Sequence, residues 1–299
     1  MSTKPEQMKQ KNIPDIPVLN GLSEIIDDYD AFIFDIYGVI HDGIRLYEHT
    51  ITCLRKLREA GKDICLLSNT PRRCHEIESD LSQINLPRDL YDHVVTAGDS
   101  AHDAVKARAG QKCWYAGTHR FEALLDGVTL EIFDTPDNAD FILNAISSSY
   151  PLSPDEIYTA LSKALDMKLP MICANPDLIV NIGDQTHICA GTYADWYLEQ
   201  GGTVSYHGKP HAPVYDMVWE MMGKPDKTRT IAIGDSLKTD IQGANDFGID
   251  SIFNLIGIHW HNIKRSDASE KPDLEKLAQM IDNQPYKPSS ILCGLSWVI

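Results

Sequence analysis

Residues 34–43 read FDIYGVIHDG, and they follow directly on Ala31, Phe32 and Ile33. The apolar run therefore ends abruptly at Asp35, and Gly38 follows shortly after it. A short apolar run that stops at a turn residue is typical of a buried strand. We interpret AFIFDIYGV, residues 31–39, as a strand whose end carries a catalytic carboxylate.

The pattern continues outward from this stretch as alternating strands and helices. Ile51, Leu54 and Leu57 recur at helical spacing within 48–60, and Gly61 ends that helix. The strand KDICLLS, the helix PRRCHEIESDLSQI and the strand HVVTA come next, and the alternation returns after residue 203 with TIAIGDS, DIQGANDFG, DSIFNLI and KPDLEKLAQMIDN. Strands joined by helices of this length predict β-α-β units and a parallel sheet.

Residues 99–203 interrupt this alternation with strand-like runs of their own, namely KCWYAG, LEIFD, DFILNAI and MICANP. A helix begins at SPDEIYTALSKAL, where Ser153 and Glu156 fit a capping box. We therefore predict an α/β protein with an arm at 1–15, a core at 16–98 and 204–299, and an inserted second domain at 99–203.

Composition excludes several classes of function. The formal net charge is −16, which argues against a nucleic-acid or anionic membrane surface, because both require basic patches. The seven cysteines form no C-x-x-C pair and lie mostly in apolar stretches, as reduced buried thiols do. The polar N-terminus lacks the apolar segment of a signal peptide, so we expect a cytoplasmic protein.

Polar residues follow the expected strands at four places. Asp35 ends the first strand, and Ser68 and Asn69 end the second just before a helix. Lys209 lies in HGKP, and GDSLKTD places Asp235 and Asp240 directly after the strand TIAIG. In open α/β sheets the carboxyl ends of the strands form the ligand crevice, so these groups are expected to meet.

Together these groups suit phosphoryl chemistry. Asp35 and Asp235, from neighbouring strand ends, could hold a hard cation such as Mg²⁺ through oxygen ligands. Mg²⁺ and Lys209 would neutralise a phosphoryl group, which lets anionic Asp35 attack phosphorus in line.

The motifs DIYGV, LLSN, GKP and GDSLKTD, in this order, resemble the four motifs of the haloacid dehalogenase-like hydrolase superfamily. The inserted domain lies between the second and third motifs, as the cap of subfamily IIA does. VVTAGDS at 94–100, ANPD at 174–177 and the helix opening AGTYADW are also similar to that subfamily. The resemblance implies a Rossmann-like parallel sheet core with an inserted α/β cap domain, and a phosphatase of small phosphorylated metabolites.

The resemblance also implies a role for each matching residue. Asp35 is the nucleophile that forms a phosphoaspartyl intermediate, and Lys209 steadies it and the transferring group. Ser68 and Asn69 bind phosphoryl oxygens. The implied Mg²⁺ ligands are Asp35, the backbone carbonyl of Tyr37, Asp235 and, directly or through a neighbour, Asp240. The implied substrate-facing residues are Asn175 and Asp177, in the cap near where it meets the core. Caps of this kind often mediate dimers, so a homodimer is one expectation and the oligomeric state stays open.

Tyr37 departs from the family, which carries a second Asp there as general acid and base. A phenol, with a pKa of about 10, can donate a proton but is a poor base near neutral pH. Because such catalysis is typically worth about 10²–10⁴-fold, we expect weak hydrolysis of alkyl phosphates. The rate of hydrolysis of aryl or acyl phosphates, whose leaving groups need no proton, should be reduced less. Asp42 and His41 are near in sequence and could supply the proton instead. Helix capping or solvent exposure explains their presence more simply.

Two other functions remain open. A phospho-ligand binder without turnover would share Asp235 and Lys209 with an enzyme. The 2-haloacid dehalogenases of the superfamily carry D-x-Y-G-T, close to DIYGV, and a halide leaves without a proton. They need no metal, however, carry their cap elsewhere and lack the acidic pair. His207 and His211 flank Lys209, and we expect them to make hydrogen bonds beside the site. We expect His259 and His261 to lie on a surface loop.

Overall fold

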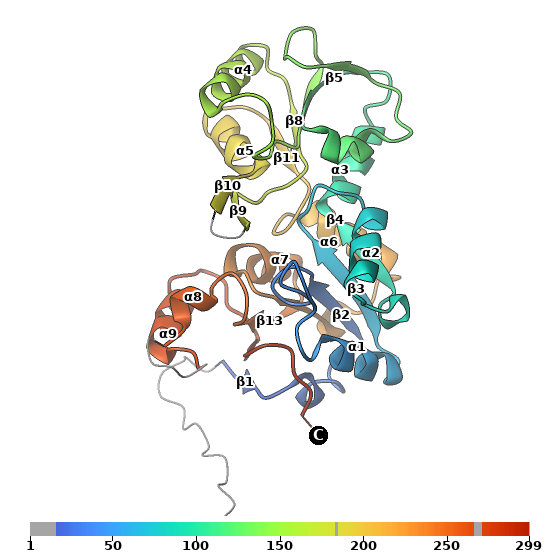
Figure 1. The fold of residues 1–299 in the computed structure, drawn as a ribbon, viewed down its shortest axis with the longest axis vertical. Coiled ribbons are helices and arrows are strands. Elements are labelled where there is room, and N and C mark those ends of the chain that lie inside the picture. The colour runs from blue at the N-terminus through green and yellow to red at the C-terminus, as the bar shows by residue number, and fades with distance from the viewer. Residues whose placement is uncertain (1–15, 183–184, 266–270, 299) are drawn as a thin grey trace, which may run out of the picture.

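The computed structural model describes residues 16–182, 185–265 and 271–298, and the expected arm at 1–15 lies outside these ranges. Two parallel sheets, each with its own helices, form the lower and upper parts of the molecule in Figure 1. The predicted Rossmann-like core with an inserted α/β cap is confirmed.

The first sheet has seven strands in the order β1-β14-β13-β12-β2-β3-β4, and every neighbouring pair is parallel. The strands are β1 (Val18–Leu19), β2 (Ala31–Asp35), β3 (Asp63–Ser68), β4 (His93–Thr96), β12 (Thr230–Gly234), β13 (Asp250–Asn254) and β14 (Ser290–Leu292). Its central strands β12, β2 and β3 are mostly apolar because helices cover both faces, and their polar residues lie at the strand ends.

Alternate residues of the central strands pack on opposite layers of helices. Phe32 and Phe34 of β2 share a buried cluster with α1 (Thr50–Glu59) and α2 (Cys74–Gln83). Ala31 and Ile33 face α6 and α7 instead. The remaining helical elements of this part are α6 (Ala212–Met221), α7 (Gln242–Phe247), α8 (Trp260–Ile263), α9 (Leu274–Asp282), the π-helix η5 (Leu237–Ile241) and the 3-10 turns η1 (Leu22–Glu24), η2 (Arg88–Leu90) and η4 (Lys227–Arg229).

The second sheet has five parallel strands in the order β11-β8-β7-β5-β6. The strands are β5 (Lys112–Ala116), β6 (Glu131–Phe133), β7 (Phe141–Asn144), β8 (Met171–Cys173) and β11 (Val204–Tyr206). One face packs on α4 (Pro154–Asp166) and α5 (Ala190–Glu199), and the other on α3 (Ala97–Lys106) and η3 (His119–Leu125). The capping box predicted for Ser153 and Glu156 is confirmed at the start of α4.

The structure differs from the expected elements in several places. β2 ends at Asp35, short of residue 39, because Gly38 takes a φ of 97° and turns the chain. β11 pairs with β8, so the second sheet extends past the boundary predicted at residue 203. An antiparallel hairpin of β9 (Ile179–Ile182) and β10 (Gln185–Ile188) was not expected.

The chain passes between the two sheets twice. It leaves the first sheet through β4 and α3, and it returns from β11 through residues 207–211 into α6. Figure 1 shows α3 and α6 at the junction of the two parts. The second crossing therefore places Lys209 between the sheets.

Candidate active site

Three strand ends of the first sheet carry residues that the sequence singled out. Asp35 is the last residue of β2, Ser68 is the last of β3, and Asp235 follows β12 directly. β2 lies between β12 and β3, and all three strands are parallel. Their carboxyl ends therefore meet at one edge, where open α/β sheets bind ligands.

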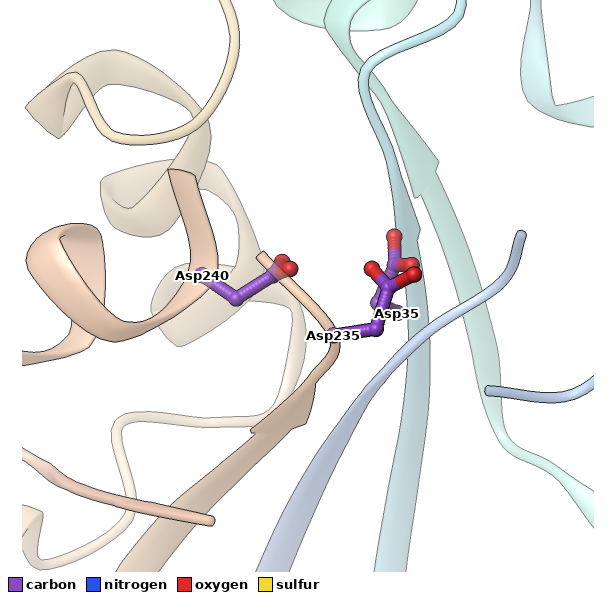
Figure 2. Close-up of side chains that lie close together, drawn as sticks. All are labelled: Asp35, Asp235 and Asp240. Atoms are coloured by element: carbon purple, nitrogen blue, oxygen red, sulfur yellow. The ribbon is translucent and has the colours of Figure 1, made fainter. Parts of the chain in front are cut away.

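Asp35, Asp235 and Asp240 form a buried acidic cluster at this edge. One carboxylate oxygen of each lies within 4.8 Å of the chosen oxygens of the other two. Figure 2 shows Asp35 and Asp235 side by side, with Asp240 reaching toward them from η5. The predicted meeting of these three residues agrees with this geometry.

Backbone groups hold two of these carboxylates in place. The N–H of Ser236 donates to Asp240 Oδ2 at 3.0 Å, and that of Ile258 donates to Asp235 Oδ2 at 2.7 Å. Gly38 closes the site from the turn after β2, since a Cβ at this position would lie 2.1 Å from Asp235 Oδ2. Its positive φ and this close approach together require glycine.

Lys209 enters the cluster from the crossing between β11 and α6. Its Nζ donates to Asp35 Oδ1 at 2.5 Å and to Asp240 Oδ1 at 2.6 Å. The side chain is buried, so both bonds are shielded from solvent. The ammonium thus ties the expected nucleophile to one of the expected metal ligands.

The electrostatics of the cluster follow from burial. Burial raises the pKa of Asp35 to about 7, with Lys209 opposing the rise and Asp240 adding to it. Burial, followed by the charges of Asp35 and Asp240, raises the pKa of Asp235 well above its usual value. Burial alone would lower the pKa of Lys209, but Asp240 and Asp35 raise it above the ordinary range.

The donor set fits a hard divalent cation such as Mg²⁺. All three side chains offer carboxylate oxygens, which are the ligands that Mg²⁺ prefers. Three carboxylates face one ammonium, so a cation would balance the buried excess of negative charge. Asp35, Asp235 and Asp240 are the residues that would hold it. Ligation by the Tyr37 carbonyl stays a prediction.

Ser68 and Asn69 lie beside this cluster, at the end of β3, but Asn69 is already engaged. Its Nδ2 donates to Asp177 Oδ1 at 2.8 Å and to the Lys209 carbonyl at 3.0 Å, and its Oδ1 accepts from the Lys209 N–H at 2.7 Å. Ser68 Oγ accepts from the N–H of Thr70 at 3.3 Å. Phosphate binding by Ser68 and Asn69 stays a prediction, and the Asn69 amide is occupied by protein partners.

The Tyr37 side chain is largely open to solvent, with 53% of the residue's surface exposed. Its ring meets that of His41 edge-on, with centroids 6.1 Å apart. Its hydroxyl has no hydrogen bond within the described residues. Asp42 Oδ1 accepts from the N–H groups of Ile44 and Arg45, each at 2.9 Å, and so stabilises the local turn. This turn is not the start of a helix, since α1 begins at Thr50, so the helix capping expected for Asp42 is wrong.

The predicted cap residues Asn175 and Asp177 lie in the loop after β8. Asn175 Oδ1 accepts from the N–H of Asp177 at 2.9 Å, and Asp177 Oδ1 accepts from Asn69 across the two sheets. Burial raises the pKa of Asp177, against the hydrogen bond from Asn69 and the charge of Lys209. Asp177 therefore has a partner in the core, which agrees with its expected place where the cap meets the core, and its contact with substrate stays a prediction.

The histidines near Lys209 make hydrogen bonds and ring contacts. His207 Nδ1 and Nε2 lie 3.0 Å from Ser100 Oγ and 2.9 Å from Ser205 Oγ, and burial lowers the pKa of His207 to about 4. His211 stacks on Tyr206. His259 lies at the start of α8 with a buried Nε2 that has no partner among the described residues, so it is not on an open surface loop as expected.

Two positioning residues were missed by sequence reasoning. Asn254 Nδ2 donates to the carbonyl of Gly38 at 3.0 Å and so supports the turn after Asp35. Asp99 accepts from Arg73 Nε at 2.7 Å and from the N–H of Cys74 at 3.0 Å, which fixes where α2 begins. The pair Thr96 and Asp99 forms a capping box at α3, a signal that the sequence did contain.

Comparison with known families and proteins agrees with this geometry. The family described as haloacid dehalogenase-like hydrolase matches residues 32–131, and an HAD-hydrolase-like family matches residues 206–279. A 4-nitrophenylphosphatase of Schizosaccharomyces pombe is 23% identical in an alignment 291 positions long, which covers 87% of this chain and 95% of that protein.

Solved structures share the whole architecture. A haloacid dehalogenase-like hydrolase from Brucella suis is 30% identical with a TM-score of 0.77, covering 93% of this chain and 100% of that one. A p-nitrophenyl phosphatase from Archaeoglobus fulgidus has the same fold at 22% identity and a TM-score of 0.71, covering 89% of this chain and 97% of that one. None of the helices in the described ranges is long and apolar enough to cross a membrane.

Proposed function

The chain belongs to subfamily IIA of the haloacid dehalogenase-like hydrolases, and on that premise we propose that it is a Mg²⁺-dependent phosphatase. Its substrate in this proposal is a small phosphate monoester, and Asp35 forms a phosphoaspartyl intermediate. The observation that carries the proposal is the buried cluster of Asp35, Asp235 and Asp240, with Lys209 bridging two of them.

The cluster supports this chemistry because both reactants are anionic. A carboxylate can approach a phosphate ester only where positive charge offsets their repulsion. A bound Mg²⁺ supplies such charge as a Lewis acid on the phosphoryl oxygens. Lys209 adds a second positive charge, which its bond to Asp35 Oδ1 holds beside the proposed nucleophile.

The reaction then has two displacements at phosphorus. Asp35 attacks, the bond from phosphorus to the ester oxygen breaks, and the leaving group departs with that electron pair. Water then attacks the phosphoaspartate and gives up a proton to the surrounding solvent. The bond from Asp35 to phosphorus breaks, which releases inorganic phosphate and restores the carboxylate.

Tyr37 should limit which phosphate esters the protein hydrolyses rapidly. It stands where the family carries its proton-transferring Asp, and a phenol is a poor base near neutral pH. We therefore propose slow hydrolysis of alkyl phosphates and faster hydrolysis of esters whose leaving group needs no proton. The names of the yeast and archaeal relatives point to an aryl phosphate as the first substrate to try.

Hydrolysis of p-nitrophenyl phosphate, with and without Mg²⁺, tests the proposal. We expect turnover with Mg²⁺ that a chelator abolishes, and no turnover by Asp35→Asn. A chain that hydrolyses nothing but is thermally stabilised by phosphate esters in the presence of Mg²⁺ would instead be a phospho-ligand binder. Tyr37 is the residue that favours this second candidate.

The 2-haloacid dehalogenase alternative is tested in the same plate by halide release from 2-chloropropionate. Such an enzyme needs no metal, so the buried carboxylate cluster argues against it. Halide release that persists in a chelator would overturn the phosphatase proposal.

A further inference from the structure

One core side chain, the amide of Asn69, holds both segments that leave the second sheet beside the active site. These segments follow the neighbouring strands β8 and β11, and they carry Asp177 and Lys209. Asn69 Nδ2 donates to Asp177 Oδ1 and to the Lys209 carbonyl, at 2.8 and 3.0 Å, while Oδ1 accepts from the Lys209 N–H at 2.7 Å.

These three bonds allow only one orientation of the amide. A flipped Asn69 would turn its oxygen toward the Asp177 carboxylate and the Lys209 carbonyl, and its NH₂ group toward the Lys209 N–H. Each contact would then pair two acceptors or two donors. The carboxylate of Asp177 therefore favours the amide orientation in which Asn69 forms both hydrogen bonds with the backbone of Lys209.

Packing joins the same segments. A Cβ on Gly208 would lie 2.6 Å from Pro176 Cδ and 2.7 Å from Asn69 Oδ1. The loop that carries Asp177 therefore packs directly against the backbone of Gly208, where there is no room for a side chain. On its other side, the N–H of Gly191 donates to the carbonyl of Asp177 at 3.2 Å. The loop is therefore held both by its own domain and by the core.

We propose that Asp177 is a positioning residue of the cap, which acts through Asn69 to hold Lys209 in place on Asp35. The path is continuous, because Lys209 Nζ lies 2.5 Å from Asp35 Oδ1. Docking of the cap loop thereby sets the geometry of the lysine at the nucleophile. The catalytic part of this inference rests on the proposed phosphatase function.

The kinetic test compares Asp177→Ala with Asp177→Asn on p-nitrophenyl phosphate and Mg²⁺. Loss of a hydrogen bond to a charged group predicts a fall in kcat of about 10- to 100-fold for Asp177→Ala. Asp177→Asn keeps a carbonyl acceptor for Asn69, so it should stay within about 3-fold of the native chain. Asp195→Asn, in the same domain, is the matched control and should change nothing. Among the residues that the structure describes, Asp195 accepts from Tyr206 Oη alone, at 2.6 Å.

A double-mutant cycle with Asn69→Ala separates positioning from substrate contact. If Asp177 acts through Asn69, adding Asp177→Ala to Asn69→Ala should cost little more kcat. Additive losses, or a rise in KM with kcat unchanged, would mean that Asp177 meets the substrate directly and would overturn the inference.

Hydrogen exchange provides a readout that needs no turnover. The Lys209 N–H donates to Asn69 Oδ1, so its protection reports this bond. We expect faster exchange at Lys209 in Asp177→Ala, native protection in Asp177→Asn and no change in Asp195→Asn. Unchanged protection in a folded Asp177→Ala would refute the inference, even if the native chain hydrolyses no phosphate ester.

Discussion

Lys209 and Asp35 stand 174 positions apart in the chain and form a buried ion pair, with Nζ 2.5 Å from Oδ1. Lys209 also bonds Asp240 at 2.6 Å, so one ammonium serves two of three clustered carboxylates. Part of the negative charge of the site is therefore offset by a residue from the crossing between the two sheets.

Replacing Lys209 by Met should impair activity and stability together. Loss of the charge beside Asp35 should lower kcat by about 10²-fold or more, as expected for a group that stabilises the transition state. Breaking a buried pair from one side should also cost about 3–5 kcal/mol of the free energy of unfolding in metal-free buffer. Kinetics and urea denaturation measure both, and Lys163→Met on the exposed face of α4 should change neither. Native-like turnover by Lys209→Met would remove Lys209 from the mechanism.

Asp235→Asn should raise the melting temperature of the metal-free protein while abolishing its response to Mg²⁺. The change removes a buried charge whose pKa is raised by burial and by Asp35 and Asp240, and the amide oxygen can still accept from Ile258. It also removes one ligand oxygen from the cluster. Thermal melts with and without Mg²⁺ check both effects, with the exposed acid Asp216→Asn as control. A Mg²⁺ shift that survives in Asp235→Asn would place the metal elsewhere.

From the sequence we could predict those features of the site that depend on where parallel strands end. Asp35, Ser68 and Asp235 could be placed together because parallel strands bring their carboxyl ends to one edge. The contact from Asp177 to Asn69, 108 positions away, could not be predicted, since it depends on how two separate sheets dock. The start of α2 was misplaced for a similar reason. Asp99, which accepts from the N–H of Cys74, lies in the first turn of α3, 25 positions away, and the local sequence pattern does not report that contact.

Tyr37→Asp should raise turnover, most of all on alkyl phosphates, because a carboxylate can both protonate the leaving oxygen and take a proton from water. The gain should approach the range of about 10²–10⁴-fold if proton transfer limits the native enzyme. The exposed ring leaves room for the smaller side chain. Rates on an alkyl and an aryl phosphate, measured side by side, provide the test.

Tyr37→Phe is the matched control for that experiment. If the phenol donates the proton, Tyr37→Phe should be slower than the native chain on alkyl phosphates and nearly equal on p-nitrophenyl phosphate. If instead Tyr37→Asp, folded and able to bind Mg²⁺, shows no gain, another group supplies the leaving-group proton.

Stability should fall on acidification because of His207. Burial lowers its pKa from 6.5 to about 4, so between these values the unfolded chain binds more protons than the folded chain. The free energy of unfolding therefore rises with pH across this window, and the stabilisation is lost as the pH falls from 6.5 to 4. At 1.36 kcal/mol per unit, the loss is about 3 kcal/mol. Urea denaturation of the native chain and His207→Gln, in chelator, isolates this contribution, because the other titrating groups cancel in the difference. Parallel stability curves for the two proteins from pH 4 to 7 would mean that His207 is protonated as readily in the fold as outside it.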